Sequence, residues 1–462
     1  MIRGAGDGDA GTAPKRPGRD SSGPTAVPTP LIAAYALAYT LGLILWLPLR
    51  LLRYLRGHRP VPFRKRMMVP DCVSPLPSGR ARLWVHAVSV GEVNSIRPLI
   101  DALNLKSSQL CISTTTETGQ RLARQLFRDR ARIFYFPLDW PWLCRKYLRR
   151  LDPAAVLVVE TEIWPGFIVA ARESGVPVVL VNGRISDRSF ARYRRFRRPL
   201  RPFLRQLDRL CMQSVQDRDR IVELGSVASR TGSVGNLKYD YSLGPDAGPA
   251  ALTRRIRSLF GADPIWICGS TREGEEEQLL DAFQETRREF PDLRMVLAPR
   301  HPRRSDEISG LLRQRGVVHL KRSGLNGFQD AGPPVRPDVL VLDTIGELAH
   351  LYELAQVVFV GGSLVAWGGH NIIEAAHFGK AILVGPHMHN FREMARNFLE
   401  GGAALQVRNS RELARRLREL LESEAARRGL GENARRILRE NRGAVARTAR
   451  IVDEYLTPVA GS

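Results

Sequence analysis

The sequence has little cysteine and little lysine for a chain of 462 residues. Its five cysteines are scattered without a CxxC pair, at positions 72, 111, 144, 211 and 268. An odd and unclustered set argues against a disulfide framework or a zinc site and indicates a reducing compartment. Cys111, Cys211 and Cys268 lie inside apolar runs, where a buried structural thiol is expected.

Lysine accounts for only seven of the 70 basic residues, and 47 acidic residues leave a net charge of +23. Such a surface attracts nucleic acid, a membrane or phosphorylated substrates. Much of the excess lies in two stretches: residues 50–66 have seven basic residues and no acid, and residues 184–209 have ten basic residues and two acids. The chain is therefore basic in patches. A 44% hydrophobic and 25% charged composition is typical of a globular protein.

Charge is absent from residues 31–49, LIAAYALAYTLGLILWLPL, which is close to the roughly 20 residues needed to cross a bilayer. The basic residues that follow predict that the chain after residue 50 is cytoplasmic. A cleaved signal peptide would have its basic residues before the apolar run. The segment either spans the bilayer, lies in one leaflet, or forms a core helix of a soluble domain. Residues 1–30, rich in Gly, Pro, Ser and Thr, are expected to be disordered.

After residue 80, short apolar runs alternate with helical patterns. Continuous apolar runs predict strands covered on both faces, and therefore parallel sheets with crossover helices. The Gly- and Pro-rich residues 241–253 indicate a linker between two such domains. Two doubly wound domains would face a cleft, with ligands beyond the carboxyl ends of the strands. The predicted strands are 81–87, 110–116, 131–137, 155–160, 177–183 and 209–214, then 264–270, 294–300, 339–344, 357–362 and 381–386.

Three acidic or basic residues follow predicted strands of the first half. Glu92 in HAVSVGE begins a helix after a small-residue turn, where it either caps the helix or takes a proton from a substrate hydroxyl. Glu160, the first residue of ETEIWP, ends a predicted strand, and an acid there is unsuited to a core. Lys238 follows a Gly-rich turn, as a compact point charge or as a solvated side chain.

The second half has candidate anion sites after its strands. ICGSTREGEEEQLL (267–280) reads as strand, Gly-Ser-Thr turn and helix, whose N–H groups would suit a phosphate, although it has neither a Walker loop nor GxGxxG. Arg300 and His301 end the next strand. Residues 343–348, DTIGEL, end another and start a helix. Asn371 and Glu374, one helical turn apart, are suited to grip a ribose.

A metal site is not expected. Four histidines cluster between residues 370 and 389, but no HExxH is present and no carboxylate interleaves with them at ligand spacing. Asp217 and Asp219 form a DxD, the signature of metal-dependent sugar transferases, but they lie among charges in a predicted helix.

Eight motifs in this order resemble the 3-deoxy-D-manno-octulosonic acid (Kdo) transferases of Gram-negative bacteria over residues 31–440. They are HAVSVGE, TTTETG, ETEIWP, NGRISDRS, GSTREGEE, PRHPRR, DTIGEL and GGSLVAWGGHNIIEAA. The resemblance implies an α/β chain with a GT-B fold, two Rossmann-like domains facing a cleft, and an N-terminal membrane-anchor helix. It also implies an inverting glycosyltransferase that moves Kdo from CMP-Kdo to the 6′-hydroxyl of a lipid A precursor (lipid IVA) in lipopolysaccharide core biosynthesis, with neither cofactor nor metal.

Matched residue by residue, the resemblance makes Glu92 the general base and assigns Glu160 and Lys238 to transition-state stabilisation. The stretches that hold CMP match Pro299, Arg300, Ile345, Gly346, Glu347, Asn371 and Glu374. Three positions depart from the family pattern: Arg272 for a common His, Gly166 for a common Asn, and Ile372–Ile373 for a Pro-Leu pair. None of these changes removes a proposed catalytic group.

The expected domains are a tail (1–30), a membrane-anchor segment (31–57), an acceptor-binding domain (58–245), a CMP-sugar-binding domain (246–440) and a C-terminal helix and tail (441–462). We expect the catalytic domains on the cytoplasmic side of the inner membrane, with the two Arg-rich stretches on anionic lipid headgroups and lipid A phosphates.

Two other functions are compatible with parts of the sequence. One is a GT-B transferase for another nucleotide sugar, against which the cytidine-side motifs argue. The other is a nucleic-acid-binding protein, which predicts aromatic residues interleaved with Lys and Arg. The sequence shows no RRM, KH or helix-turn-helix pattern, so we expect no nucleic-acid partner.

Overall fold

The computed structural model describes residues 26–55, 63–70, 81–240, 248–327 and 336–457. The chain divides into two compact units, Met1–Leu237 with Gly443–Ser462 (unit 1) and Lys238–Arg442 (unit 2). The predicted tail up to residue 25, Cys72 and linker residues 241–247 lie outside the described residues. The other four cysteines are buried, which confirms the prediction for Cys111, Cys211 and Cys268.

Unit 1 contains a seven-stranded parallel sheet in the order β3-β2-β1-β4-β5-β6-β7. All six strands predicted for this half are present, and β7 is added. Alternate residues of each strand face different core clusters: Trp84 and Val156 lie in one, whereas Leu83 and Leu157 lie in the other. Burial on both faces explains why these strands read as continuous apolar runs. The strands are β1 (Leu83–His86), β2 (Leu110–Thr114), β3 (Arg132–Tyr135), β4 (Ala155–Val159), β5 (Val178–Gly183), β6 (Arg209–Met212) and β7 (Thr231–Ser233).

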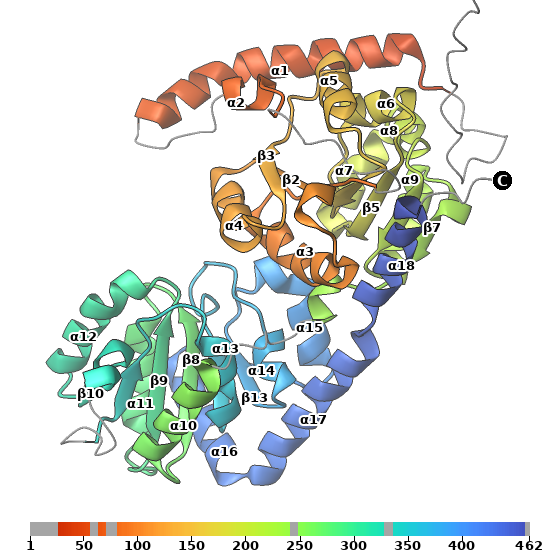
Figure 1. Ribbon diagram of the computed structural model, residues 1–462. Helices are drawn as coiled ribbons and strands as arrows, with labels where there is room; N and C mark the ends of the chain where they lie inside the picture. Colours follow the sequence, from red (N-terminus) through yellow and green to blue (C-terminus); the bar gives the residue numbers. More distant parts are fainter. Residues whose placement is uncertain (1–25, 56–62, 71–80, 241–247, 328–335, 458–462) are drawn as a thin grey trace, which may run out of the picture. The chain divides into compact units, whose positions relative to one another are not determined.

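Helices cover both faces of this sheet (Figure 1). The last of them, at the C-terminal end of the chain, packs against the first crossover helix and contributes Ala444, Val445 and Val452 to the unit 1 core. The helices are α3 (Val90–Leu103), α4 (Glu117–Phe127), α5 (Pro141–Leu151), α6 (Pro165–Glu173), α7 (Asp187–Arg195), α8 (Arg197–Leu204), α9 (Val215–Leu224) and α18 (Ala444–Leu456).

Unit 2 contains a second seven-stranded parallel sheet, in the order β10-β11-β9-β8-β12-β13-β14. All five strands predicted for this half are present. The sequence reading missed the short strands β10 and β14. The strands are β8 (Ile265–Thr271), β9 (Arg294–Pro299), β10 (His319–Lys321), β11 (Val339–Val341), β12 (Val357–Val360), β13 (Ala381–Val384) and β14 (Leu405–Gln406).

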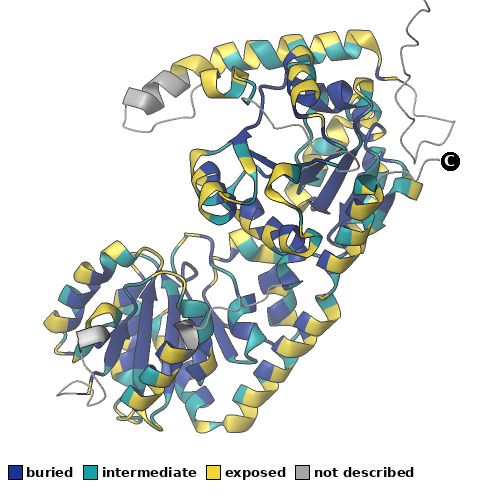
Figure 2. Ribbon diagram, in the orientation of Figure 1, coloured by how far each residue is buried: buried dark blue, intermediate teal, exposed yellow. Residues whose placement is uncertain are grey.

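The helices of unit 2 again cover a sheet buried on both faces, as the dark strands in Figure 2 show. Residues 248–253, predicted as part of the linker, belong to a helix because Leu252 and Ile256 bury an apolar stripe in the core. The helices are α10 (Gly248–Phe260), α11 (Glu276–Thr286), α12 (Ser305–Gln314), α13 (Leu348–Leu351), α14 (Ile373–His377), α15 (Arg392–Glu400), α16 (Ser410–Glu422) and α17 (Glu424–Asn441).

The N-terminal apolar segment forms one long helix, α1 (Thr29–Leu55), followed by the short α2 (Phe63–Met67). Polar groups attach one face of α1 to unit 1. Tyr35 Oη donates to Asp139 Oδ2 at 2.6 Å, Asp139 N donates to Tyr39 Oη at 3.2 Å, and Trp140 Nε1 donates to Thr40 Oγ1 at 2.9 Å. The docked face of α1 is therefore specified by hydrogen bonds.

The other face of α1 is apolar and exposed (Figure 2). Leu37, Leu41, Ile44 and Leu45 are between 50% and 76% exposed. In the described part of the chain, α1 is the single helix that is long and apolar enough to cross a membrane, and none of its apolar window is buried. This exposure argues against a helix enclosed in a soluble core.

Candidate active site

Glu92 lies in the first turn of α3 and is 6% exposed. Its Oε1 accepts a hydrogen bond from Ser89 Oγ at 2.8 Å, and its Oε2 accepts one from Val88 N at 2.7 Å. Glu92 N in turn donates to Ser89 Oγ at 3.4 Å. Ser89 is therefore the N-cap of α3, and its hydroxyl and the Val88 amide hold the Glu92 carboxylate in one orientation.

The electrostatic surroundings of Glu92 differ from those of an ordinary cap. Burial raises its pKa to about 8; the Val88 and Ser89 hydrogen bonds oppose that rise, and the charges of Glu160 and Glu162 add to it. Burial and the charge of Glu160 also raise the pKa of Glu162. Unit 1 thus brings the predicted residues Glu92 and Glu160 close enough to repel one another. A carboxyl with a pKa near the working pH is suited to general base catalysis.

Glu160 follows β4 in the left-handed region of backbone space, with φ 58°. This conformation costs a non-glycine residue roughly 1 kcal/mol or more and is common at functional sites. The bond from Glu160 N to Val181 O, at 2.9 Å, ties the turn to β5. The sequence reading identified Glu160 from its place after a strand, but it gave no sign of this strained turn.

Lys238 lies at the boundary of the two units and is assigned to unit 2. The residue before it, Leu237, donates its N–H to Asn182 Oδ1 at 3.0 Å. Asn182 itself is fully buried and left-handed, with φ 55°. Lys238 Nζ lies 6.0 Å from the centroid of the Phe391 ring. The unit 1 core therefore fixes the backbone that leads into Lys238.

Two polar groups buried in unit 1, the His86 ring and the Trp164 indole nitrogen, were not identified from the sequence. His86 ends β1 and stacks on Phe136 at 3.7 Å, and burial lowers its pKa to about 3, so the ring is neutral. Within the described residues, His86 Nε2 and Trp164 Nε1 have no hydrogen-bond partner. Both residues belong to motifs already described, HAVSVGE and ETEIWP. Their burial and their missing hydrogen-bond partners depend on the folded structure and cannot be predicted from these motifs.

In unit 2, Pro299 ends β9, and Arg300 follows with its N–H bonded to Thr271 O at 3.0 Å. The Arg300 side chain is exposed. Its charge lowers the pKa values of Glu374 and His370, although burial is the largest influence on both. Arg300 is therefore close to the predicted ribose-binding residue Glu374 and gives this part of unit 2 a positive charge.

Asn371 and Glu374 meet at the start of α14. Asn371 Nδ2 donates to Glu374 Oε1 at 3.5 Å, and Asn371 Oδ1 accepts from Ile373 N at 3.1 Å. Burial raises the pKa of Glu374 to about 7, while Asn371 and Arg300 oppose that rise. The structure thus brings together the predicted residues Arg300, Asn371 and Glu374.

The DTIGEL segment follows β11 and leads into a helix that begins at Leu348, as predicted. Ile345 is 81% exposed and Gly346 has φ 92°. The Glu347 carboxylate accepts hydrogen bonds from Arg322 Nη2 at 2.8 Å and from Thr344 Oγ1. The helix that follows, α13, has four residues.

The expected phosphate turn at 267–280 is corrected by the structure. Gly269, Ser270 and Thr271 belong to strand β8, and α11 begins at Glu276. The buried Glu275 carboxylate accepts four backbone N–H bonds, from Arg272 at 2.9 Å, Gly362 at 2.6 Å, and Ser363 and Leu364 at 2.8 Å each. The anion among these amides is the chain's own side chain, and one of the four amides, Arg272 N, belongs to the predicted turn.

The DxD aspartates have structural contacts. Asp217 is 4% exposed and accepts bonds from Ile185 N at 2.7 Å and Ser214 Oγ at 2.5 Å. Asp219 pairs with Arg218 at 2.6 Å. Across the ranges that the structure describes, no group of three or more His, Cys, Asp or Glu residues is arranged to hold a metal ion.

Comparisons with known proteins cover both units. Residues 62–241 match the family model of 3-deoxy-D-manno-octulosonic-acid transferase (kdotransferase), and residues 335–437 match that of glycosyl transferases group 1. The 3-deoxy-D-manno-octulosonic acid transferase of Bordetella pertussis is 35% identical over 386 residues, which is 81% of this chain and 88% of the relative. That of Haemophilus influenzae is 33% identical over 389 residues, 83% and 88% of the two chains.

A solved structure supports the fold. UDP-GlcNAc 2-epimerase from Neisseria meningitidis, bound to UDP-GlcNAc, aligns with a TM-score of 0.52 at 13% identity over 81% of this chain and 99% of that one. At this identity the likeness concerns the fold alone, and together with the two parallel sheets it confirms the GT-B prediction. The chain belongs to the family of 3-deoxy-D-manno-octulosonic acid transferases and is a glycosyltransferase.

Proposed function

We propose that the enzyme transfers Kdo from CMP-Kdo to the 6′-hydroxyl of a lipid A precursor (lipid IVA), in lipopolysaccharide core biosynthesis. Family membership supplies the transferred sugar. The observation that carries the proposal is the Glu92 carboxylate, which is fixed by Ser89 and Val88 and has its pKa raised to about 8. A glycosyl transfer to a hydroxyl needs such a base, because the alcohol loses its proton as it attacks.

The reaction is a single displacement. Glu92 accepts the proton of the acceptor hydroxyl while the hydroxyl oxygen forms a bond to the anomeric C2 of Kdo. The bond from C2 to the phosphate oxygen breaks, and its electron pair leaves with CMP. Attack opposite the leaving group inverts C2. We assign Glu160 and Lys238 to stabilising the charges that develop in this transition state.

The CMP moiety binds to unit 2 in this proposal. Arg300 faces the phosphate, while Asn371 and Glu374, bonded to each other at 3.5 Å, receive the ribose hydroxyls. Pro299 and residues 345–347 line the nucleotide. A guanidinium supplies the positive charge that a leaving phosphate needs, so we propose that the enzyme requires neither a cofactor nor a metal.

The membrane holds the enzyme through α1 in this proposal. The exposed apolar face of α1 enters the lipid, and the catalytic units lie on the cytoplasmic side of the inner membrane. Basic side chains on α7 and α8, including Arg192, Arg195 and Arg198, are exposed and suit anionic headgroups. Arg50, Arg53, Arg56 and Arg59 of the other basic stretch have side chains outside the described residues.

The test is incubation of the membrane fraction with CMP-Kdo and tetra-acylated lipid A precursor, followed by mass spectrometry. The proposal predicts a Kdo adduct, release of CMP and undiminished yield after treatment with EDTA. Intact CMP-Kdo with no adduct would refute the donor and acceptor assignment. Loss of yield in EDTA that added Mg²⁺ restores would refute metal independence alone.

A further inference from the structure

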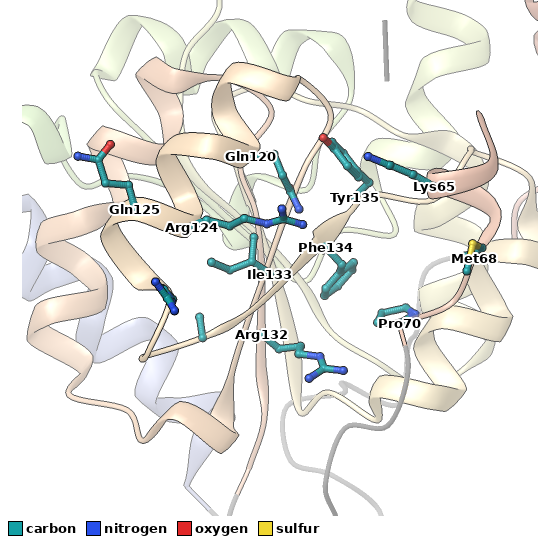
Figure 3. Close-up of a pocket in the computed structure, with 12 residues that line it drawn as sticks. Lys65, Met68, Pro70, Gln120, Arg124, Gln125, Arg132, Ile133, Phe134 and Tyr135 are labelled. Atoms are coloured by element: carbon teal, nitrogen blue, oxygen red, sulfur yellow. The ribbon is translucent and has the colours of Figure 1, made fainter. Parts of the chain in front are cut away.

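A groove of about 1010 Å³ runs along the outer edge of unit 1, outside the residues assigned above (Figure 3). Its floor is β3, the edge strand of the sheet, which pairs with β2 on its inner side. Helix α4 forms one wall, and the segment from α2 to Pro70 forms the other. A groove of this size accommodates a sugar headgroup.

The groove has a positive lining. Four of its described lining residues are basic and none is acidic; the basic ones are Lys65, Arg124, Arg128 and Arg132. The nearest acid on α4, Glu117, pairs with Arg121 at 3.6 Å. Guanidinium groups bind phosphate through paired N–H donors. A dianionic ligand therefore suits the groove better than a neutral one.

A buried donor without a partner points into the same groove. Gln120 is 2% exposed and lines the groove. Its Oε1 accepts a bond from Thr114 Oγ1 at 2.6 Å, whereas its Nε2 has no partner among the described residues. An unsatisfied buried donor costs about 1–3 kcal/mol. Figure 3 shows the Gln120 amide and the Arg124 guanidinium, one helical turn apart, directed toward β3.

The opposite wall is held in place by hydrogen bonds. Arg66 donates to Phe136 O at 2.9 Å and to Pro137 O at 3.0 Å, and Tyr147 Oη donates to Met68 O at 2.6 Å. These bonds leave Lys65 over the Tyr135 ring, with Nζ 5.9 Å from its centroid. The groove is consequently preformed on both sides, which lowers the entropic cost of binding.

Hydrogen bonds also connect this groove to the Glu92 turn. Thr116, the N-cap of α4, donates from Oγ1 to Val88 O at 3.0 Å, and Val88 N donates to Glu92 Oε2 at 2.7 Å. Gln120 lies one turn further along α4. The N-cap of the helix that carries Gln120 is therefore bonded to the turn that fixes Glu92.

We propose that this groove binds a phosphate group of the acceptor's sugar headgroup, with Arg124 and Gln120 as its central donors. This inference rests on the proposed function, because it names a part of the acceptor. The basic residues Lys65, Arg128 and Arg132 surround the phosphate, and the Gln120 amide gains the partner that the described residues do not provide. The groove thereby orients the headgroup relative to Glu92.

The experiment measures Kdo transfer in neutral detergent micelles, with a lipid A precursor that carries both phosphates and with an enzymatically dephosphorylated one. Arg124→Ala is the main variant, because its exposed helical position tolerates alanine. Arg450→Ala, equally exposed on α18, removes the same charge elsewhere in unit 1, outside both Arg-rich stretches. We expect Arg124→Ala to raise KM for the phosphorylated acceptor about tenfold with little change in kcat, and to leave KM for the dephosphorylated acceptor unchanged.

Equal effects of Arg124→Ala and Arg450→Ala, or equal losses with both acceptors, would overturn the phosphate site. A parallel binding titration, without CMP-Kdo, follows the phosphorylated acceptor on wild type, Arg124→Ala and Gln120→Leu. If wild type transfers no Kdo, the proposed function fails, but this titration still tests the phosphate site. Tenfold weaker binding of the acceptor by both variants would support the phosphate site. Unchanged affinity would refute it. A competition experiment adds phosphatidylglycerol to the micelles at the same phosphate concentration as the acceptor. If this lipid displaces the acceptor, the groove binds bulk lipid headgroups and the inference is overturned.

Discussion

Selected carboxylates of the two units have different electrostatic and hydrogen-bonding surroundings. In unit 1, Glu92 and Glu162 have raised pKa values, and the charge of Glu160 adds to the effect of burial on both. In unit 2, Glu275 accepts four backbone N–H bonds, and Glu347 pairs with Arg322 at 2.8 Å. The three acids around Glu92 in unit 1 thus repel one another, whereas Glu275 and Glu347 in unit 2 are held by hydrogen-bond donors.

This difference separates a reactive carboxylate from a structural one. Burial raises the pKa of both Glu92 and Glu275, but only at Glu92 do neighbouring carboxylates add to the rise, so Glu92 is ready to exchange a proton near neutral pH. Donors and cations hold a carboxylate in one place and let it organise a loop, as Glu275 organises residues 362–364. Position after a strand is shared by both kinds, so the neighbours decide the role.

Removing the carboxylate of Glu92 is the largest test of this comparison. Glu92→Gln keeps the size of the side chain but has no basic oxygen, and loss of a general base lowers kcat about 10²–10⁴-fold. Binding of CMP, measured by titration calorimetry, is expected to stay unchanged because its proposed site is in unit 2. Retention of more than a tenth of wild-type kcat would contradict the role of Glu92.

Removing the carboxylate of Glu275 is expected to affect stability. Glu275→Ala leaves four backbone N–H groups without their acceptor, and the loss of such a buried partner costs roughly 3–5 kcal/mol. Urea denaturation followed by circular dichroism measures the change. Glu273→Ala, two residues away and exposed, is the control and is expected to change the free energy of unfolding by about 0.5 kcal/mol or less. Similar midpoints for the two variants would show that Glu275 is not a structural clamp.

Removing Arg300 tests the cation that unit 2 places near Glu374. Arg300→Ala is expected to weaken CMP binding about tenfold, the usual loss for one charged contact to phosphate. Arg288→Ala removes an exposed charge of the same unit and is expected to leave the affinity unchanged. Equal affinities for CMP in both variants would remove Arg300 from the donor site.

Neutralising Glu160 is expected to have the smallest effect of these changes, a shift in pH dependence, and it tests whether Glu160 acts on Glu92 as a like charge. Its charge raises the pKa of Glu92, so Glu160→Gln lowers that pKa, and the base becomes ionised at lower pH. The pH at which kcat/KM is half-maximal is expected to fall by about one unit or less. A shift to higher pH would mean that Glu160 does not act on Glu92 as a like charge. The measurement remains possible even if kcat falls, because the midpoint is independent of the maximum.

The sequence predicts the sheets well because strands buried on both faces are continuous apolar runs. The three missed strands, β7, β10 and β14, have at most three residues each, and none of them is buried along its whole length, unlike the equally short β11. Glu92 and Glu160 could be predicted because functional residues of parallel sheets follow the strands. The role of Glu275 could not, because its partners Gly362, Ser363 and Leu364 come nearly 90 residues later.

Gly166 shows how a departure from a family pattern acquires a physical reason. In this structure a Cβ at position 166 would lie 2.2 Å from Asp139 O, so a larger residue requires the backbone to move. Gly166 N and Phe167 N donate to the Asp139 carboxylate at 3.0 and 2.7 Å. The same carboxylate receives Tyr35 of α1. The glycine is therefore tied to the docking of α1, a relation that spans more than 100 residues and is invisible in a local motif.

The most direct test of the account is the pH dependence of kcat/KM for Kdo transfer by the wild-type enzyme. Only the ionised form of Glu92 is a base, and its pKa in the free enzyme is raised to about 8, so kcat/KM is expected to rise about tenfold per pH unit below that value and to level off above it. The rise should be absent from the residual activity of Glu92→Gln. A wild-type profile that is flat between pH 6 and 9, or whose midpoint lies near the usual glutamate pKa of about 4.3, would contradict the account.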